Sequence, residues 1–232
     1  MRPAVSVRRS GVTAGVDRSL IGCLAAAILS VVGCGVGGDR RVATTASANV
    51  RIAAVGDILL DRRVGAAIAA DGPDYPFERV APVLRDADLA IGNLECPITD
   101  SDARAPKPFS FRVRPAAARG LIPSGLDILG LANNHTLDCG RSGLADTMSW
   151  IDRARLSYCG AGASARRAGT GREIRVGGHR VRFLSFCDVI QDASFPTAGS
   201  PTIAQLPAEE VRRAIQTARR RSDLVVASFH WG

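Results

Sequence analysis

The stretch DILGLANNHTLDCG, residues 127–140, decides how the chain is expected to fold. Its first six residues form an apolar run of strand length, and this run leads directly into Asn133, Asn134 and His135, with Asp138 just beyond. In open α/β sheets, ligand sites form outside the carboxyl ends of the strands. We therefore interpret the two amides and the imidazole as the rim of a site at the end of a buried strand.

Polar groups that can ligate a metal recur at the ends of other predicted strands. Asp57 follows the predicted strand at 49–55, Asn93 and Glu95 lie at the end of the strand at 88–93, and His230 follows the strand at 223–229. Carboxylate, amide oxygen and imidazole are suitable ligands for Mn, Fe or Zn. Each residue alone has an ordinary explanation, because an Asp after a strand usually caps a helix or forms a turn. The hypothesis of one metal site rests on the recurrence at four strand ends.

Predicted strands alternate with predicted helices through most of the chain, which indicates the α/β class. The near-continuous apolar strands favour a sheet that is covered on both faces. The remaining expected elements are helices at 61–70, 77–85, 115–122, 144–156 and 207–221, a half-exposed strand at 109–113, and a hairpin that joins 173–176 to 181–186.

The first 34 residues are predicted to be a lipoprotein-type signal peptide. Arginines precede an apolar run at 20–32, which ends in the sequence VVGC, and this resembles a lipoprotein cleavage box with Cys34 as the lipidated residue. The alternatives are an ordinary signal peptide with an incidental cysteine, or an uncut membrane anchor. A flexible linker is expected at 35–49, followed by one domain at 50–232. We expect the protein on the outer face of the cell membrane or outside the cell.

The charge of the chain limits which binding partners are expected, and its cysteine spacing limits which cysteine chemistry is expected. The formal net charge is +8, of which about +5 remains after the predicted leader, and Lys107 is the only lysine. Arginine or lysine runs with interleaved aromatics are lacking, which argues against nucleic acid, whereas the positive balance suits an acidic polymer or anionic headgroups. The four cysteines beyond the leader form no CxxC pair, so we expect either disulfides or free buried thiols: Cys96, Cys139, Cys159 and Cys187.

Several segments, taken in order, resemble the CapA family, which is named for poly-γ-glutamate capsule synthesis. They are VGDILL, YPFERVAPVLRDADLAIGNLECPIT, LDILGLANNHTLDCGRSGLADT, GAG at 160–162 and the terminal SFHWG. The resemblance extends from about residue 51 to residue 232. It implies a fold similar to calcineurin-like metallophosphoesterases, which is a sandwich of two β-sheets flanked by helices.

The resemblance also implies roles for the residues at the strand ends. Metal ligands would be Asp57, Asn93, Glu95, Asn134 and His230. His135 would be the general acid or the group that stabilises the transition state, and Asp138 would orient His135 or its loop. The implied cofactor is a divalent ion (Mn, Fe, Zn or Mg), and the substrate is an acidic polymer or a phosphoester. Arg112 and Arg114 could attract such a polyanion.

The sequence departs from these patterns at two places. Leu59 stands where phosphoesterases carry a histidine, which removes one ligand of a two-metal site. CapA-like domains continue past the HWG strand, so we expect this chain to lack the C-terminal part of the fold and to be inactive or impaired. Two alternatives stay open: a non-catalytic surface lipoprotein that assists a membrane polymer synthase in assembly or export, and a general metallophosphatase.

Overall fold

The computed structural model describes residues 49–188, 201–205 and 207–231. The predicted signal peptide, Cys34 and nearly all of the predicted linker lie outside these residues, so those assignments stay predictions. Within the described residues, no helix is long and apolar enough to cross a lipid bilayer.

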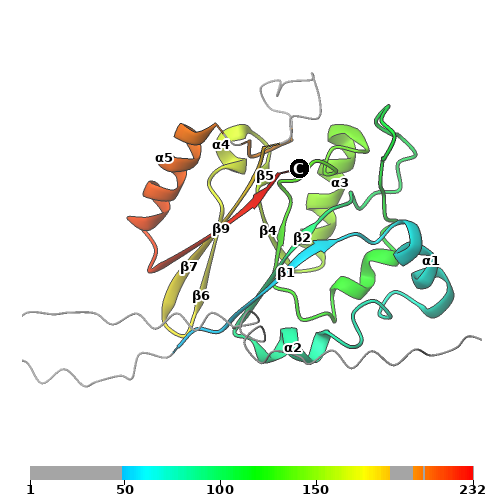
Figure 1. The fold of residues 1–232 in the computed structure, drawn as a ribbon, viewed down its shortest axis with the longest axis horizontal. Helices are drawn as coiled ribbons and strands as arrows, with labels where there is room; N and C mark the ends of the chain where they lie inside the picture. Colours follow the sequence, from blue (N-terminus) through cyan, green and yellow to red (C-terminus); the bar gives the residue numbers. More distant parts are fainter. Residues whose placement is uncertain (1–48, 189–200, 206, 232) are drawn as a thin grey trace, which may run out of the picture. The chain divides into compact units, whose positions relative to one another are not determined.

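The first sheet has four parallel strands in the order β1-β2-β3-β4 (Figure 1). The strands are β1 (Ile52–Ile58), β2 (Leu89–Leu94), β3 (Ile128–Gly130) and β4 (Ser157–Cys159). Parallel strands need crossover connections. These contain α1 (Arg62–Asp71) and α2 (Ala81–Asp86) before β2, the 3₁₀ helix η1 (Ala117–Leu121) before β3, and α3 (Gly140–Arg153) before β4.

The second sheet has the order β6-β7-β9. The strands β6 (Arg172–Val176) and β7 (His179–Cys187) form the predicted antiparallel hairpin. The helix α5 (Ala208–Arg219) then leads to β9 (Leu224–His230), which pairs with β7 in parallel. A short antiparallel pair joins β5 (Ala161–Gly162) to β8 (Thr202–Ile203), and the short helix α4 (Ala165–Ala168) follows β5.

The two sheets pack face to face through a cluster of buried apolar side chains. Leu89, Ile91 and Ile128 come from the first sheet, and Val181 and Phe183 come from the second. Side chains alternate between the two faces of a strand, so the intervening residues face outward. These outward residues pack against α1 and α3 on one side and against α5 on the other. The predicted fold class is therefore confirmed: the chain is an α/β sandwich of two sheets flanked by helices (Figure 1).

One predicted strand is wrong. Residues 109–113 form only an isolated bridge between Val113 and Ile98. The backbone N–H of Phe111 donates to Asp138 at 2.6 Å, and the N–H of Arg112 donates to Asp61 at 2.9 Å. Because these donors bond to side-chain carboxylates, they are not available to a neighbouring strand.

Three predicted helices differ from the structure in their bounds or type. The helix expected at 77–85 begins only at Ala81, after a series of turns. The helix expected at 115–122 is a 3₁₀ helix, and α3 begins four residues before the predicted start.

Gly160 marks a close approach of the two sheets. Its φ is +82°, and a Cβ there would lie 2.8 Å from the Cβ atoms of both Ala132 and Ser185. Gly178, in the hairpin turn, has a similar φ of +84° but no atom within 4 Å of the same position. We expect Gly160→Ala to lower the free energy of unfolding by about 3 kcal/mol and Gly178→Ala by about 1 kcal/mol, because only the first adds overpacking to backbone strain. Urea denaturation of both variants measures this difference, and equal losses would contradict it.

Candidate metal centre

The alternation of side chains along the strands places polar groups at one end of the space between the sheets. In β2, Leu89 and Ile91 face the second sheet, so Asn93 continues the same face at the carboxyl end of the strand. Asp57 is the register partner of Asn93 on β1. His230 ends β9 on the face that also carries that strand's contributions to the inter-sheet core. Segments that lie far apart in the sequence thus meet at one point.

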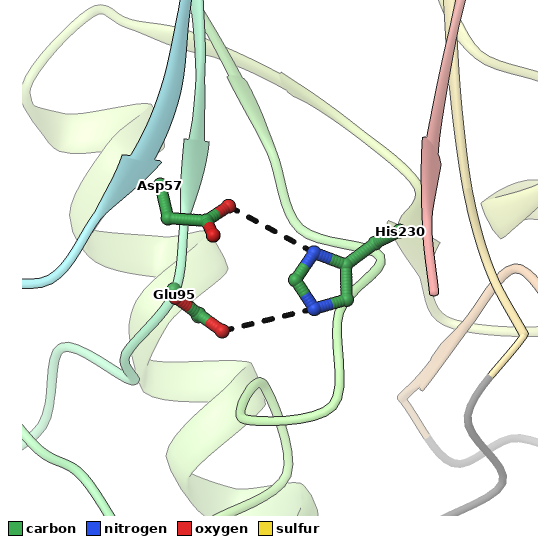
Figure 2. Close-up of side chains that lie close together, drawn as sticks. All are labelled: Asp57, Glu95 and His230. Atoms are coloured by element: carbon green, nitrogen blue, oxygen red, sulfur yellow. Dashed lines mark ion pairs between the residues drawn. The ribbon is translucent and has the colours of Figure 1, made fainter. Parts of the chain in front are cut away.

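Asp57, Glu95 and His230 form a compact cluster of potential metal ligands. One ligand atom of each residue lies within 4.8 Å of the others. Nδ1 of His230 is 3.8 Å from Oδ1 of Asp57, and its Nε2 is 3.7 Å from Oε1 of Glu95. Figure 2 shows the imidazole reaching from β9 toward the two carboxylates, which come from β1 and from the end of β2. The side chain of Asp57 is 53% exposed, against 16% for Glu95 and 18% for His230, so the cluster opens to solvent beside Asp57.

Asn93 is oriented by a buried amide, Asn133, which the sequence placed at the rim of the site without a specific role. Oδ1 of Asn133 accepts from the N–H of His135 at 3.0 Å, and its Nδ2 donates to the Leu94 carbonyl and to Oδ1 of Asn93. Nδ2 of Asn93 therefore points at Asp57, 2.7 Å away, and lies 3.3 Å from Nδ1 of His230. A ligating Asn93 would need its oxygen there, which would set two NH₂ groups against each other. The arrangement makes Asn93 a donor that positions the cluster.

Asn134 reaches the cluster from the loop after β3. Its Oδ1 lies 2.9 Å from Nε2 of His230. An amide oxygen beside the imidazole and the Glu95 carboxylate is a further potential ligand. The structure thus brings four of the five predicted ligands together with the donor atom facing the cluster: Asp57, Glu95, Asn134 and His230.

His135 and Asp138 are in contact, as the family resemblance implied. Nδ1 of His135 is 2.8 Å from Oδ2 of the fully buried Asp138, and the ring of Phe111 lies against the imidazole with centroids 4.1 Å apart. Oδ2 of Asp138 also accepts from the Phe111 N–H. A carboxylate that accepts these bonds requires the proton of the imidazole on Nδ1, which leaves Nε2 as an acceptor. Burial lowers the pKa of His135, although the hydrogen bond to Asp138 opposes this, so the ring is neutral near pH 7.

Lys107 is a residue of this site that the sequence analysis missed. It lies in the loop between β2 and η1, and its side chain is 20% exposed. Its ammonium forms an ion pair with Oδ1 of Asp138 and donates to the carbonyl of Asn134 at 2.9 Å. The loop has no periodicity to reveal this contact. The one available signal was that a single lysine occurs among so many arginines.

Glu95 is poised between its two protonation states near neutral pH. Burial and then the negative charge of Asp57 raise the pKa of Glu95 from 4.5 to about 7. A nearby cation would relieve both effects, since it favours the ionised carboxylate. The raised pKa is thus what two neighbouring carboxylates produce when they share a site suited to a positive charge.

The raised pKa of Glu95 predicts a dependence of stability on pH. Below about pH 4.5 the carboxyl is protonated in both the folded and the unfolded chain, so it does not reduce the free energy of unfolding. As the pH rises from there through about 7, the carboxyl ionises more readily in the unfolded chain, and the free energy of unfolding falls. In the presence of a chelator, we expect Glu95→Gln to be more stable than the wild type by about 2 kcal/mol at about pH 8, after allowance for solvent screening, and equal at about pH 4. Urea denaturation across this range measures the difference, and a difference that does not change with pH would contradict it.

The four cysteines within the described residues are buried and form no disulfide. Of the two alternatives from the sequence, buried thiols rather than disulfides are therefore confirmed. Burial raises the pKa of Cys96 to about 12, so this thiol is a poor nucleophile and a poor ligand despite its place beside Glu95.

Arg112 and Arg114 both lie beside acidic residues, which reduce the net positive charge that they offer to a polyanion. Nη1 of Arg112 is 2.6 Å from Oδ1 of Asp102, and Arg114 lies within 3.4 Å of both Asp100 and Asp102. Two neighbouring acids therefore offset the charge of both arginines, which the alternation in the sequence did not reveal.

The comparison with protein families finds a match over residues 51–232 to the family described as "Bacterial capsule synthesis protein PGA_cap". The match covers the whole described domain.

Curated relatives carry names that agree with this family. The capsule biosynthesis protein CapA of Bacillus anthracis is 31% identical over 186 residues, which cover 77% of this chain and 45% of that protein. The PGA biosynthesis protein CapA of Bacillus subtilis (strain 168) is 29% identical over 181 residues, or 77% of this chain and 48% of that protein. A probable polyglutamine synthesis accessory protein of Mycobacterium tuberculosis is 27% identical over 173 residues, which cover 68% of this chain and 45% of that protein. The chain spans about half the length of these relatives.

Proposed function

This chain belongs to the PGA_cap family of bacterial capsule synthesis proteins, and from this membership we propose that it acts on poly-γ-glutamate, an acidic polymer, through a metal-dependent hydrolytic site. The supporting observation is the approach of Asp57, Glu95 and His230 to within 4.8 Å of one another. Asn134 adds an amide oxygen to the set. Hard and borderline divalent ions such as Mg, Mn, Fe and Zn accept such donors.

Different residues around the cluster would have different roles in the reaction. A bound divalent cation would lower the pKa of a water molecule and polarise the scissile group. The two carboxylates, the imidazole of His230 and Asn134 would hold the cation, and Asn93 would keep Asp57 in place through its amide N–H bond. His135 would exchange a proton with the substrate through Nε2, because Asp138 holds its Nδ1–H.

A hydrolysis assay tests this proposal. The purified domain, loaded with Mn or Zn, is incubated with γ-glutamyl polymer and separately with a generic phosphodiester, and product formation is followed. We expect cleavage of the polymer to fall about 100-fold in His135→Gln, within the range usual for lost acid–base catalysis. His179→Gln, in the hairpin of β6 and β7 and outside the cluster, is the matched control and should retain the wild-type rate.

The outcomes separate the competing roles. Cleavage of the phosphodiester alone would favour a general metallophosphatase. No cleavage of either substrate by protein that binds metal would favour a non-catalytic accessory role, with a membrane polymer synthase as partner. A relative bears the word accessory in its name.

We also propose that the chain is exported and lipidated at Cys34. The support is the order of the leader, in which arginines precede an apolar run that ends in VVGC. Incorporation of a labelled fatty acid by the wild type but not by Cys34→Ala is expected, and equal labelling of both would exclude this cysteine.

A further inference from the structure

A concave surface lies on the outer side of the β6-β7-β9 sheet, away from the metal centre. It is a groove of about 470 Å³ between α4, β7 and α5. Figure 1 shows α4 and α5 together on the same side of the second sheet. Four arginines line the groove: Arg166, Arg182, Arg213 and Arg221. We call this surface the arginine groove.

The charges in the arginine groove are poorly balanced. Glu210 is the one acidic residue in its lining. Within the described part of the chain, Arg166 and Arg221 form no salt bridge, in contrast to Arg112 and Arg114. Unpaired arginines gathered in a concave surface create a positive potential that concentrates anions.

Two of the arginines have partners that leave capacity for a ligand. Arg182 is held by Glu173 at 2.8 Å, yet its buried Nε has no hydrogen-bond partner among the described residues. Arg213 lies 3.6 Å from Glu209, and both side chains are well exposed, so this pair contributes little. A buried N–H without a partner is uncommon, and the planar fork of an arginine suits a carboxylate.

The arrangement of the groove is linear. Arg213, Thr217 and Arg221 are spaced four residues apart, so they lie on one face of the α5 segment and its end over about 12 Å. A single phosphate or sulfate ion cannot contact both ends of such a row. An extended chain that carries a negative charge on each repeat can.

We propose that the arginine groove binds the carboxylates of an acidic polymer and that it is a docking site separate from the metal centre. The inference rests on the proposed function, from which poly-γ-glutamate is the polymer. A lipid surface fits less well, because the lining between the arginines is made of small side chains such as Ala165, Gly169 and Ala214. A membrane-binding face would carry exposed large apolar residues.

Binding of a poly-γ-glutamate oligomer to the metal-free full chain, measured by calorimetry in the presence of a chelator, tests the proposal. We expect the double variant Arg166→Gln/Arg221→Gln to bind about tenfold more weakly, because each lost charge contact is worth about threefold. The affinity of the wild type should fall as salt rises. The matched control is Arg63→Gln/Arg79→Gln, which removes two exposed charges elsewhere and should leave the affinity unchanged.

Further measurements distinguish a failure of the groove proposal from a failure of the proposed function. The groove proposal is overturned if the double arginine variant binds the oligomer as tightly as the wild type does. Equal affinity for inorganic phosphate, or stronger binding to phosphatidylglycerol vesicles than to the oligomer, would also overturn it. Cation binding at the metal centre, measured on the same protein samples, tests the proposed function independently of the groove.

Discussion

Replacing Asp57 with alanine should lower the affinity for Mn or Zn by more than about 100-fold. Residues that merely support metal ligands already contribute roughly 10- to 100-fold, and Asp57 supplies one of two carboxylates in the cluster. The side chain is 53% exposed, so its loss should change the free energy of unfolding little. Calorimetric titration of the chelator-treated protein measures the affinity, and Asp71→Ala is the control, because it removes an exposed carboxylate outside the cluster.

A second readout shows whether Asp57 acts on the cluster at all. After burial, the charge of Asp57 is the main reason that the pKa of Glu95 is raised to about 7. Asp57→Ala should therefore lower the pKa of Glu95, and the pH at which stability declines should move down with it. Wild-type cation affinity together with an unchanged pKa would refute the assignment of Asp57 to the metal centre.

The strand ends of the site could be read from the sequence because they follow local rules. In LAIGNL, side chains alternate between the two faces of the strand, so Asn93 lies on the same face as the apolar residues Leu89 and Ile91. The run that ends at Asn133 and Asn134 likewise placed two amides at the end of a buried strand. The contact of His135 with Asp138, which the family resemblance implied, joins side chains only three residues apart.

The rest of the site depends on contacts across the sheets, which local patterns do not encode. Nothing in the strand before His230 indicates that it belongs to the second sheet and reaches across to Glu95. The segment at 109–113 alternates like a strand, but Asp61 and Asp138 accept its backbone N–H groups. The orientation of Asn93 follows from Asn133, which is fixed in turn by a main-chain carbonyl.

The ion pair between Lys107 and Asp138 should be one of the largest single contributions to stability at this site. Asp138 is fully buried, so Lys107→Met would leave a carboxylate in the interior without its cation. We expect a loss of about 3 kcal/mol in the free energy of unfolding. Arg104→Met, in the same loop, replaces an exposed cation by the same side chain and should cost less than about 0.5 kcal/mol.

A double-mutant cycle separates this ion pair from general damage to the loop. Asp138→Asn removes the negative charge, so Lys107→Met made in that background no longer strands a carboxylate. The combined variant should therefore lose about 2 kcal/mol less than the sum of the two single variants. The nitrogen shifts of His135, one of three histidines in the chain, should report the Nδ1–H tautomer in the wild type. Strictly additive losses would mean that Lys107 and Asp138 do not depend on each other, and an Nε2–H tautomer in the wild type would mean that Asp138 does not hold the ring.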